Sequence, residues 1–154
     1  MTIRVTNAGP DADTLHVLPH LWYRNTWSWD GTPPHELVAD GASVRTEHPF
    51  LGPLMLDLSP GAELLFCDNE ANTARLFGVP GPRYPKDGIN DHVAAGAATV
   101  NPARRGSKCA AWYRLTVDGG ATVELRLRLS SAAARRSTTW SPPAGPKPTR
   151  STPT

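Results

Sequence analysis

Long hydrophobic runs are missing from this chain of 154 residues, and only 19% of its residues are charged. No apolar stretch reaches the length of a membrane-spanning helix, and the first ten residues lack the apolar core of a secretory leader. Cysteine is also scarce. Cys67 and Cys109 are too few for a disulfide-stabilised scaffold, so we expect them to be free, buried thiols. These absences argue against a membrane protein and predict a cytoplasmic one.

The short motifs of many enzyme families are absent as well. The sequence has no phosphate-binding glycine loop, no dinucleotide-binding glycine run, no nucleophile elbow and no H-E-x-x-H zinc motif. The pairs Asp87-Gly88 and Asn90-Asp91 resemble pieces of a calcium loop, but the spacing and the final glutamate are missing. We therefore predict no cofactor.

Two histidines, His16 and His20, fall on one face of an expected strand. At the usual rise per residue they would be roughly 13 Å apart. One zinc ion cannot bridge that distance unless the backbone bends sharply at Pro19. We interpret both as surface or hydrogen-bonded histidines, and we predict no metal site.

Positive charge is concentrated at the C-terminal end. Residues 130–154 hold four of the 16 basic residues and no acidic residue, which leaves 12 basic against 14 acidic residues before them. The net charge of +2 therefore gives no basic patch on a folded face, and we expect no nucleic-acid partner. The same segment is rich in Ser, Thr, Ala and Pro, with Trp140 as its one aromatic residue. Such a composition predicts a disordered tail.

Residues 1–129 have the pattern of short strands separated by turns. The expected strands are 3–6, 15–24, 44–48, 54–58, 63–68, 109–117 and 121–129, with loops at 30–42 and 99–107. Two short helices are expected at 71–77 and 85–95, each followed by a glycine. The pattern predicts a mostly β fold: a partial antiparallel β-sandwich with two short helical insertions and the disordered C-terminal tail.

Some of these strands carry finer expectations. Strand 15–24 is apolar on both faces, which is typical of a central or covered strand, while Pro19 indicates an edge or a bulge. The turn Asp118-Gly119-Gly120 predicts a hairpin between the last two strands. In strand 121–129, alternate apolar residues ending at Leu129 are expected to face inward.

A pair of carboxylates, Asp68 and Glu70, precedes the first expected helix. Two carboxylates can divide acid and base roles in glycoside hydrolysis when they flank the scissile bond. At a helix start they more often cap the first N–H groups and complement the helix dipole. We favour capping over catalysis here, with Asp68 or Asn69 as the cap.

The most informative stretch holds three of the five tryptophans: Trp22, Trp27 and Trp29. Indole rings gathered after an apolar strand indicate a packed core, a partner surface or a platform for a sugar ring. Arg24 and Asn25 beside them offer polar contacts for sugar hydroxyls. We favour packing against a core or a partner domain over direct sugar stacking.

Four segments together carry a resemblance to a known family: residues 3–29, 63–78 (E-L-L-F-C-D-N-E-A-N-T-A-R-L-F-G), 84–93 (Y-P-K-D-G-I-N-D-H-V) and 99–115. In this order they resemble the N-terminal, non-catalytic β-sandwich region of bacterial glucosidase-like proteins of glycoside hydrolase family 63, the mannosyl-oligosaccharide glucosidase relatives. The resemblance covers residues 2 to about 129. It implies that hydrolysis of glucosyl linkages belongs to an (α/α)₆ barrel that follows the sandwich and is missing here.

No catalytic residue can therefore be assigned in this chain, which is predicted to be inactive alone. The first functional hypothesis is an incomplete N-terminal domain, residues 1–129, whose tryptophans meet the missing barrel. The second is a free-standing carbohydrate-binding module that uses Trp22, Trp27 and Trp29. A third is a structural partner of a separately encoded barrel.

The tail, residues 130–154, suggests a frameshift. With GC-rich codons, a shift of one base turns 138–154 into approximately D-L-V-S-A-R-R-A-E-A-D-A-F-Y-A, which is helix-favouring and suits an entry into the catalytic domain. The hypothesis is a frameshift near residues 130–137.

Overall fold

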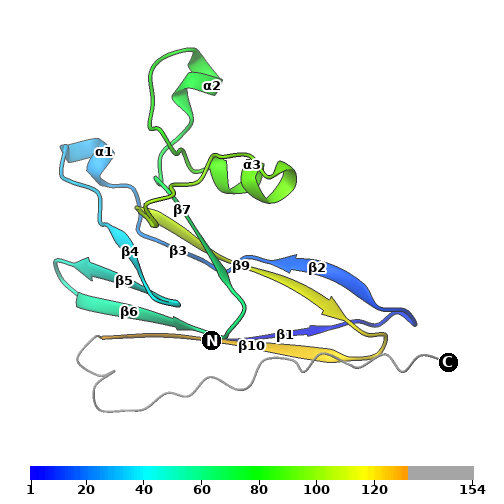
Figure 1. Cartoon of the computed structure of the whole chain (residues 1–154). Coiled ribbons are helices and arrows are strands. Elements are labelled where there is room, and N and C mark those ends of the chain that lie inside the picture. The colour runs from blue at the N-terminus through cyan, green and yellow to red at the C-terminus, as the bar shows by residue number, and fades with distance from the viewer. Residues whose placement is uncertain (132–154) are drawn as a thin grey trace.

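Two antiparallel β-sheets and three short helices make up the part of the chain that the computed structural model describes, residues 1–131 (Figure 1). The expected mostly β fold is confirmed. The predicted disordered tail lies outside the described residues from position 132 onward. The last strand runs to Ser131, two residues beyond the expected domain boundary.

The larger sheet has six strands. In spatial order they are β1 (Thr2–Thr6), β10 (Thr122–Ser131), β6 (Gly52–Leu58), β5 (Ser43–His48), β4 (Leu37–Asp40) and β8 (Arg105–Gly106). β4 and β8 lie in segments that the sequence predicts to be loops. Both are very short, and prolines and glycines flank β4, so the local pattern carries too little alternation to reveal them.

The smaller sheet is built around one long central strand, β9 (Lys108–Val117). Its other strands are β2 (Asp13–Val17), β3 (His20–Trp22) and β7 (Glu63–Cys67). β3 and β7 pair with the same residues of β9, so they lie on opposite sides of it, and β2 continues the line of β3.

The expected strand 15–24 is thus divided between β2 and β3 and lies at the edge of the sheet, which corrects the prediction of a central or covered strand. The register runs on without a bulge, because Val17 lies opposite Tyr113 and Leu21 opposite Cys109. Pro19 has no N–H group, but its carbonyl oxygen accepts a hydrogen bond from Ala111 N at 2.9 Å. An edge position tolerates proline because one side of the strand needs no donor.

The two sheets pack face to face, as in a β-sandwich. Buried side chains of β9 meet those of β6 and β10; these are Leu58, Ala111, Tyr113, Leu115, Val117, Leu125 and Leu127. The hydroxyl of Tyr113, which is buried with them, donates to Ser59 O at 2.9 Å, so its polar end is satisfied. This shared core holds the sandwich together through apolar burial.

The last two strands do not form the predicted hairpin. β9 pairs with β2, β3 and β7, whereas β10 pairs with β1 and β6, so the turn at Asp118-Gly119-Gly120 carries the chain from one sheet to the other. Each strand has an apolar face that meets the other sheet, so the two strands pack face to face instead of pairing edge to edge. Leu129, expected to face inward, is 52% exposed.

The helices are short, and each ends at a glycine in the left-handed conformation. α2 (Thr73–Phe77) and α3 (Gly88–Ala95) correspond to the two expected helices. α1 (Trp27–Asp30) is a single turn that the sequence did not predict, because four residues show no helical periodicity. None of the described helices is long and apolar enough to cross a membrane.

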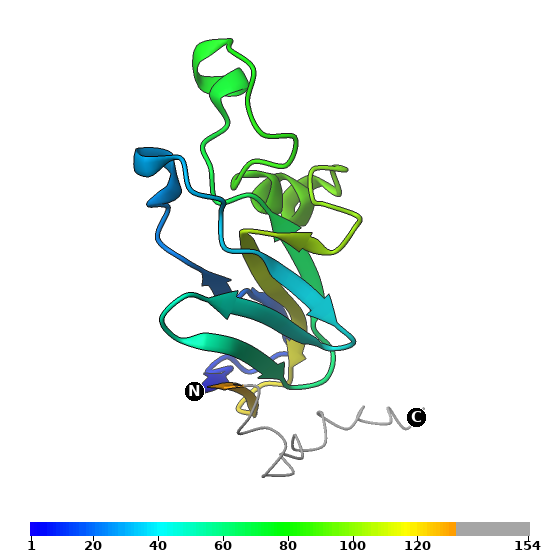
Figure 2. The ribbon, with the colours of Figure 1, turned by 90° about the vertical axis from the view of Figure 1, so that its left-hand side faces the viewer.

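α3 covers the outer face of the smaller sheet. Ile89 of this helix is buried against Leu65, Ala110 and Trp112, and Val93 packs against the same cluster. The helix therefore adds a partial third layer beside the sandwich, and α1 and α2 project beyond it at one end (Figures 1 and 2).

Candidate functional site

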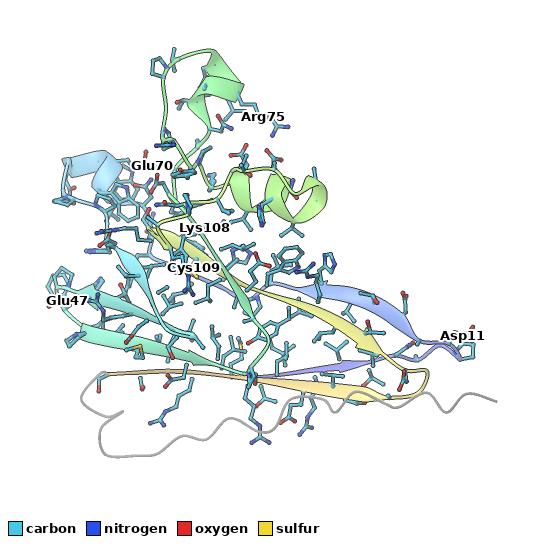
Figure 3. The ribbon with its side chains drawn as sticks, in the orientation of Figure 1. Asp11, Glu47, Glu70, Arg75, Lys108 and Cys109 are labelled. Carbon is cyan, nitrogen blue, oxygen red and sulfur yellow. The ribbon has the colours of Figure 1, made fainter. Side chains whose placement is uncertain are left out.

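A cleft of about 1130 Å³ lies between α1 and the segment that carries α2. Trp22, Asn25 and Trp27 line one side, and Glu70 and residues 80–82 line the other. Lys86 and Lys108 also line it. Figure 3 shows Glu70 and Lys108 at this same end of the molecule. The cleft combines aromatic rings with a few polar and charged groups, which is typical of a small-molecule site.

Two asparagines fix the walls of the cleft relative to each other. The side chain of Asn25 donates to Asn69 O at 3.0 Å, and the side chain of Asn69 donates to Tyr23 O at 2.9 Å. The backbone N–H of Asn69 donates to the Ser107 hydroxyl at 2.8 Å. These crossed bonds join the chain after β3 to the chain after β7, so the two segments are held although they are far apart in the sequence.

The three tryptophans have different surroundings. Trp27 is only 6% exposed; its indole N–H donates to Glu70 Oε1 at 3.4 Å, and its ring lies 6.3 Å from that of His35. Trp22 is 52% exposed and lines the cleft, while Trp29 is 69% exposed and is not part of the lining. The predicted cluster is therefore not one flat platform.

Of the predicted site residues, the cleft brings together Trp22, Asn25 and Trp27. Arg24 and Trp29 lie beside it and contact each other, with the guanidinium 5.0 Å from the ring centroid. An exposed cation over an indole ring of this kind is a modest stabilising contact.

The capping interpretation of Asp68 and Glu70 is wrong. α2 begins at Thr73, and its cap is Asn72, whose side chain accepts from Arg75 N at 3.1 Å. Glu70 instead accepts from Trp27 in the cleft. Burial, and then the neighbouring Glu70, raise the pKa of Asp68.

The two histidines of the edge strand have different surroundings. The ring of His16 makes an edge contact with Trp112 at 5.4 Å. Burial, and then the charge of Lys108, lower the pKa of His20. Within residues 1–131, no three His, Cys, Asp or Glu side chains are grouped so as to hold a metal ion.

The residues of the calcium-like pairs bind a side chain of the protein itself. One carboxylate oxygen of Asp87 and one of Asp91 each lie 3.4 Å from the guanidinium of Arg75. The two aspartates therefore connect α3 to α2, and this contact steadies the outer wall beside the cleft.

Sequence reasoning missed Lys86 and Lys108. Burial lowers the pKa of Lys108, and the charge of Lys86 acts in the same direction, while Cys67 opposes it. Neither lysine forms an ion pair with a described carboxylate within 4.0 Å. Only the strand register reveals Lys108, because it places this residue directly opposite Trp22.

The fold and this site define an antiparallel β-sandwich with a polar and aromatic cleft at one end. The chain is similar to Uncharacterized protein YMR196W of Saccharomyces cerevisiae, with 28% identity over 152 aligned residues. The match covers 79% of this chain but only 14% of the yeast protein, so the chain spans a small part of that relative. No family model and no solved structure matches the chain.

Proposed function

We propose that this chain is the non-catalytic β-sandwich domain of an α-glucosidase-like glycoside hydrolase. In this proposal it docks against an (α/α)₆ catalytic barrel, and the whole enzyme hydrolyses glucosyl linkages in an oligosaccharide. The chain alone has no hydrolytic activity. The resemblance of its four segments to glycoside hydrolase family 63 and the much greater length of the yeast relative support this assignment.

The observation that carries the docking proposal is a set of exposed apolar side chains on one edge strand, two short helices and one turn. They lie at the end of β3, on α1, in the β5–β6 turn, and on and just after α2: Trp22, Trp29, Phe50, Leu51, Leu76, Phe77 and Val79. In Figure 2, α1 and the β5–β6 turn lie on the side that faces the viewer, and α2 stands above the sandwich. A patch of this kind is typical of a surface that contacts another domain.

The test is the nucleotide sequence from codon 130 onward. We expect the alternative reading frame to continue without stops and to encode a helical domain. In the chain with the frame restored, we expect hydrolysis of glucosyl disaccharides, whereas the present chain should give none. Stops in that frame, or hydrolysis by the present chain, would contradict the proposal.

A second candidate function is carbohydrate binding by the free chain. The cleft favours it, because Trp22 and Trp27 line the same space as Asn25 and Glu70. Calorimetry against a panel of glucosides and mannosides separates the two candidates. A carbohydrate-binding module binds one of them and loses the interaction in Trp22→Ala, whereas a docking domain binds none.

A cytoplasmic location is part of the proposal. Cys67 and Cys109 lie on neighbouring strands, and both are free, buried thiols. Free thiols are usual in proteins of reducing compartments, so the two free cysteines support a cytoplasmic location.

A further inference from the structure

We propose that the cleft binds an anionic sugar, with the sugar ring against Trp22 and its carboxylate or phosphate group between Lys86 and Lys108. This inference rests on the carbohydrate-binding candidate and names its ligand class. It does not depend on the docking proposal, because the cleft is open in the described chain.

The strand register brings the aromatic ring and the first lysine together. Trp22 of β3 and Lys108 of β9 are antiparallel partners, so their side chains leave the sheet on the same face. Both line the cleft, and Trp22 is half exposed there. A half-exposed indole beside an ammonium group presents an apolar face and a charge to one small ligand.

The second lysine comes from the opposite wall. The backbone N–H of Lys86 donates to Glu70 O at 3.0 Å, which anchors this part of the wall. Its side chain lines the cleft and also an adjoining cavity of about 260 Å³, which Lys108 and His20 line too. Both lysines therefore border both spaces, whereas His20 lines only the smaller one, and burial together with the charge of Lys108 lowers its pKa.

These cations lack a matching anion among the described side chains. Neither lysine has an ion pair with a described side chain, and burial, with a smaller contribution from the charge of Lys86, lowers the pKa of Lys108. Glu70, the one carboxylate of the cleft lining, already accepts from Trp27. A ligand anion between the lysines would offset their repulsion and replace lost hydration.

The cleft also offers contacts for the neutral part of a sugar. Oε1 of Glu70 accepts the hydrogen bond from Trp27. Its other carboxylate oxygen has no hydrogen bond to a described residue, so it can accept one from a sugar hydroxyl. Ser28 and Asn69 line the same space. Sugar rings present hydroxyl edges and apolar faces, which fits a lining of amides, one carboxylate and one indole face.

The experiment titrates the full chain by calorimetry with four probes: glucuronate, glucose 6-phosphate, glucose and inorganic phosphate. We expect at least one anionic sugar to bind about tenfold more tightly than glucose, the amount that a charge-assisted hydrogen bond supplies. Comparison of glucuronate with glucose 6-phosphate identifies the anion. The affinity should fall as salt is raised.

Variants assign the effect to the cleft. Lys108→Gln and Lys86→Gln should each weaken the anionic sugar about tenfold and leave glucose unchanged. The matched control, Arg45→Gln, removes one positive charge from an exposed position on the other sheet and should change nothing. Thermal unfolding checks each variant; if Lys108→Gln does not fold, Lys86→Gln, in a loop, carries the test.

Other outcomes overturn the inference. Equal affinity for glucose and the anionic sugars, or inorganic phosphate binding as tightly as glucose 6-phosphate, contradicts an anionic sugar site. Anionic-sugar binding that the lysine variants leave intact would keep the carbohydrate candidate and remove only this inference. Failure of all four probes to bind would contradict this site while leaving the docking proposal intact.

Discussion

Trp27 and Trp29 are two positions apart, yet their contacts differ completely. Trp27 is buried, with its N–H bonded to Glu70 across the cleft, while Trp29 stands in solvent beneath Arg24. Both belong to the single turn α1, and a one-turn helix presents neighbouring residues in different directions. The role of each indole is therefore decided by its own surroundings.

The first prediction compares the two rings. Trp27→Ala should lower the free energy of unfolding by about 3 kcal/mol, because it removes a buried ring and leaves a cavity. The control Trp29→Ala should change it by less than about 0.5 kcal/mol, since that ring is exposed. Urea denaturation followed by circular dichroism measures both. Similar losses in the two variants would show that α1 does not fix Trp27 as described.

Three buried acids predict a loss of stability in alkali. Burial raises the pKa of Cys67, Cys109 and Tyr113 to about 12 each. The unfolded chain releases the thiol protons near pH 9.0 and the phenol proton near 10.0, whereas the folded chain keeps them. The folded state then binds more protons, so its stability falls as the pH rises from about 9 towards 12. Lys108 acts in the opposite direction, but it is one group against three.

Urea denaturation at a series of pH values from 8 to 11 tests whether the free energy of unfolding falls or rises with pH. The free energy of unfolding should decline above about pH 9, and Cys109→Ala should show a shallower decline because one of the three groups is gone. A stability that stays level or increases over this range would be inconsistent with buried, neutral thiols.

At the scale of elements, the turn after β9 decides that β9 and β10 lie in different sheets. It joins the two sheets and packs against the turn between β1 and β2. Asn7 connects them: its side chain donates to Val117 O at 2.8 Å, and its carbonyl oxygen accepts from Gly120 N at 2.9 Å. A Cβ atom at Gly119 would overlap the carbonyl oxygens of Pro10 and Gly9. The close approach of two backbones explains this glycine.

The third prediction follows from that contact. Gly119→Ala should cost about 1–3 kcal/mol of stability, because a backbone carbonyl cannot move aside as a side chain can. Gly9→Ala is the matched control in the facing turn. Its Cβ would meet only Asn7 Oδ1, at 3.2 Å, and should cost less. Chemical denaturation ranks the two, and the reverse order would mean that the turns do not meet.

The elements also show how far sequence patterns reach. Alternation and turn residues predict β1, β5, β6, β7, β9 and β10 to within two residues, and the following glycines mark the ends of α2 and α3. The hairpin prediction fails because Asp118-Gly119-Gly120 indicates a reversal of the chain but not whether the strands pair or pack. The capping prediction fails because α2 starts at Thr73, later than its pattern suggests.

At the scale of the whole molecule, the sandwich has two unlike ends. The turns between β1 and β2 and between β9 and β10 lie at one end, and α1 and the β5–β6 turn lie at the other (Figure 1). Phe50, in the β5–β6 turn, is 92% exposed. A surface that covered this turn would remove that ring from water.

The fourth prediction is that the isolated chain self-associates through this end. Sedimentation velocity should show weight-average mass increasing with concentration, and the double variant Trp29→Ser, Phe77→Ser should reduce the increase. Leu129→Ser removes an exposed apolar side chain from β10 instead and should leave the association unchanged. A wild-type chain that stays monomeric at every concentration would contradict self-association through these exposed apolar side chains.

The sequence by itself determined the fold class, the main strands and the two longer helices. These follow from local periodicity and from turn residues, which act over a few positions. Only the tertiary structure decided that Trp27 is buried, that β9 and β10 lie in different sheets, and that Lys86 and Lys108 meet Trp22 in one cleft. The physical reason is that strand pairing and sheet packing join residues far apart in the chain, and local patterns carry no information about those partners.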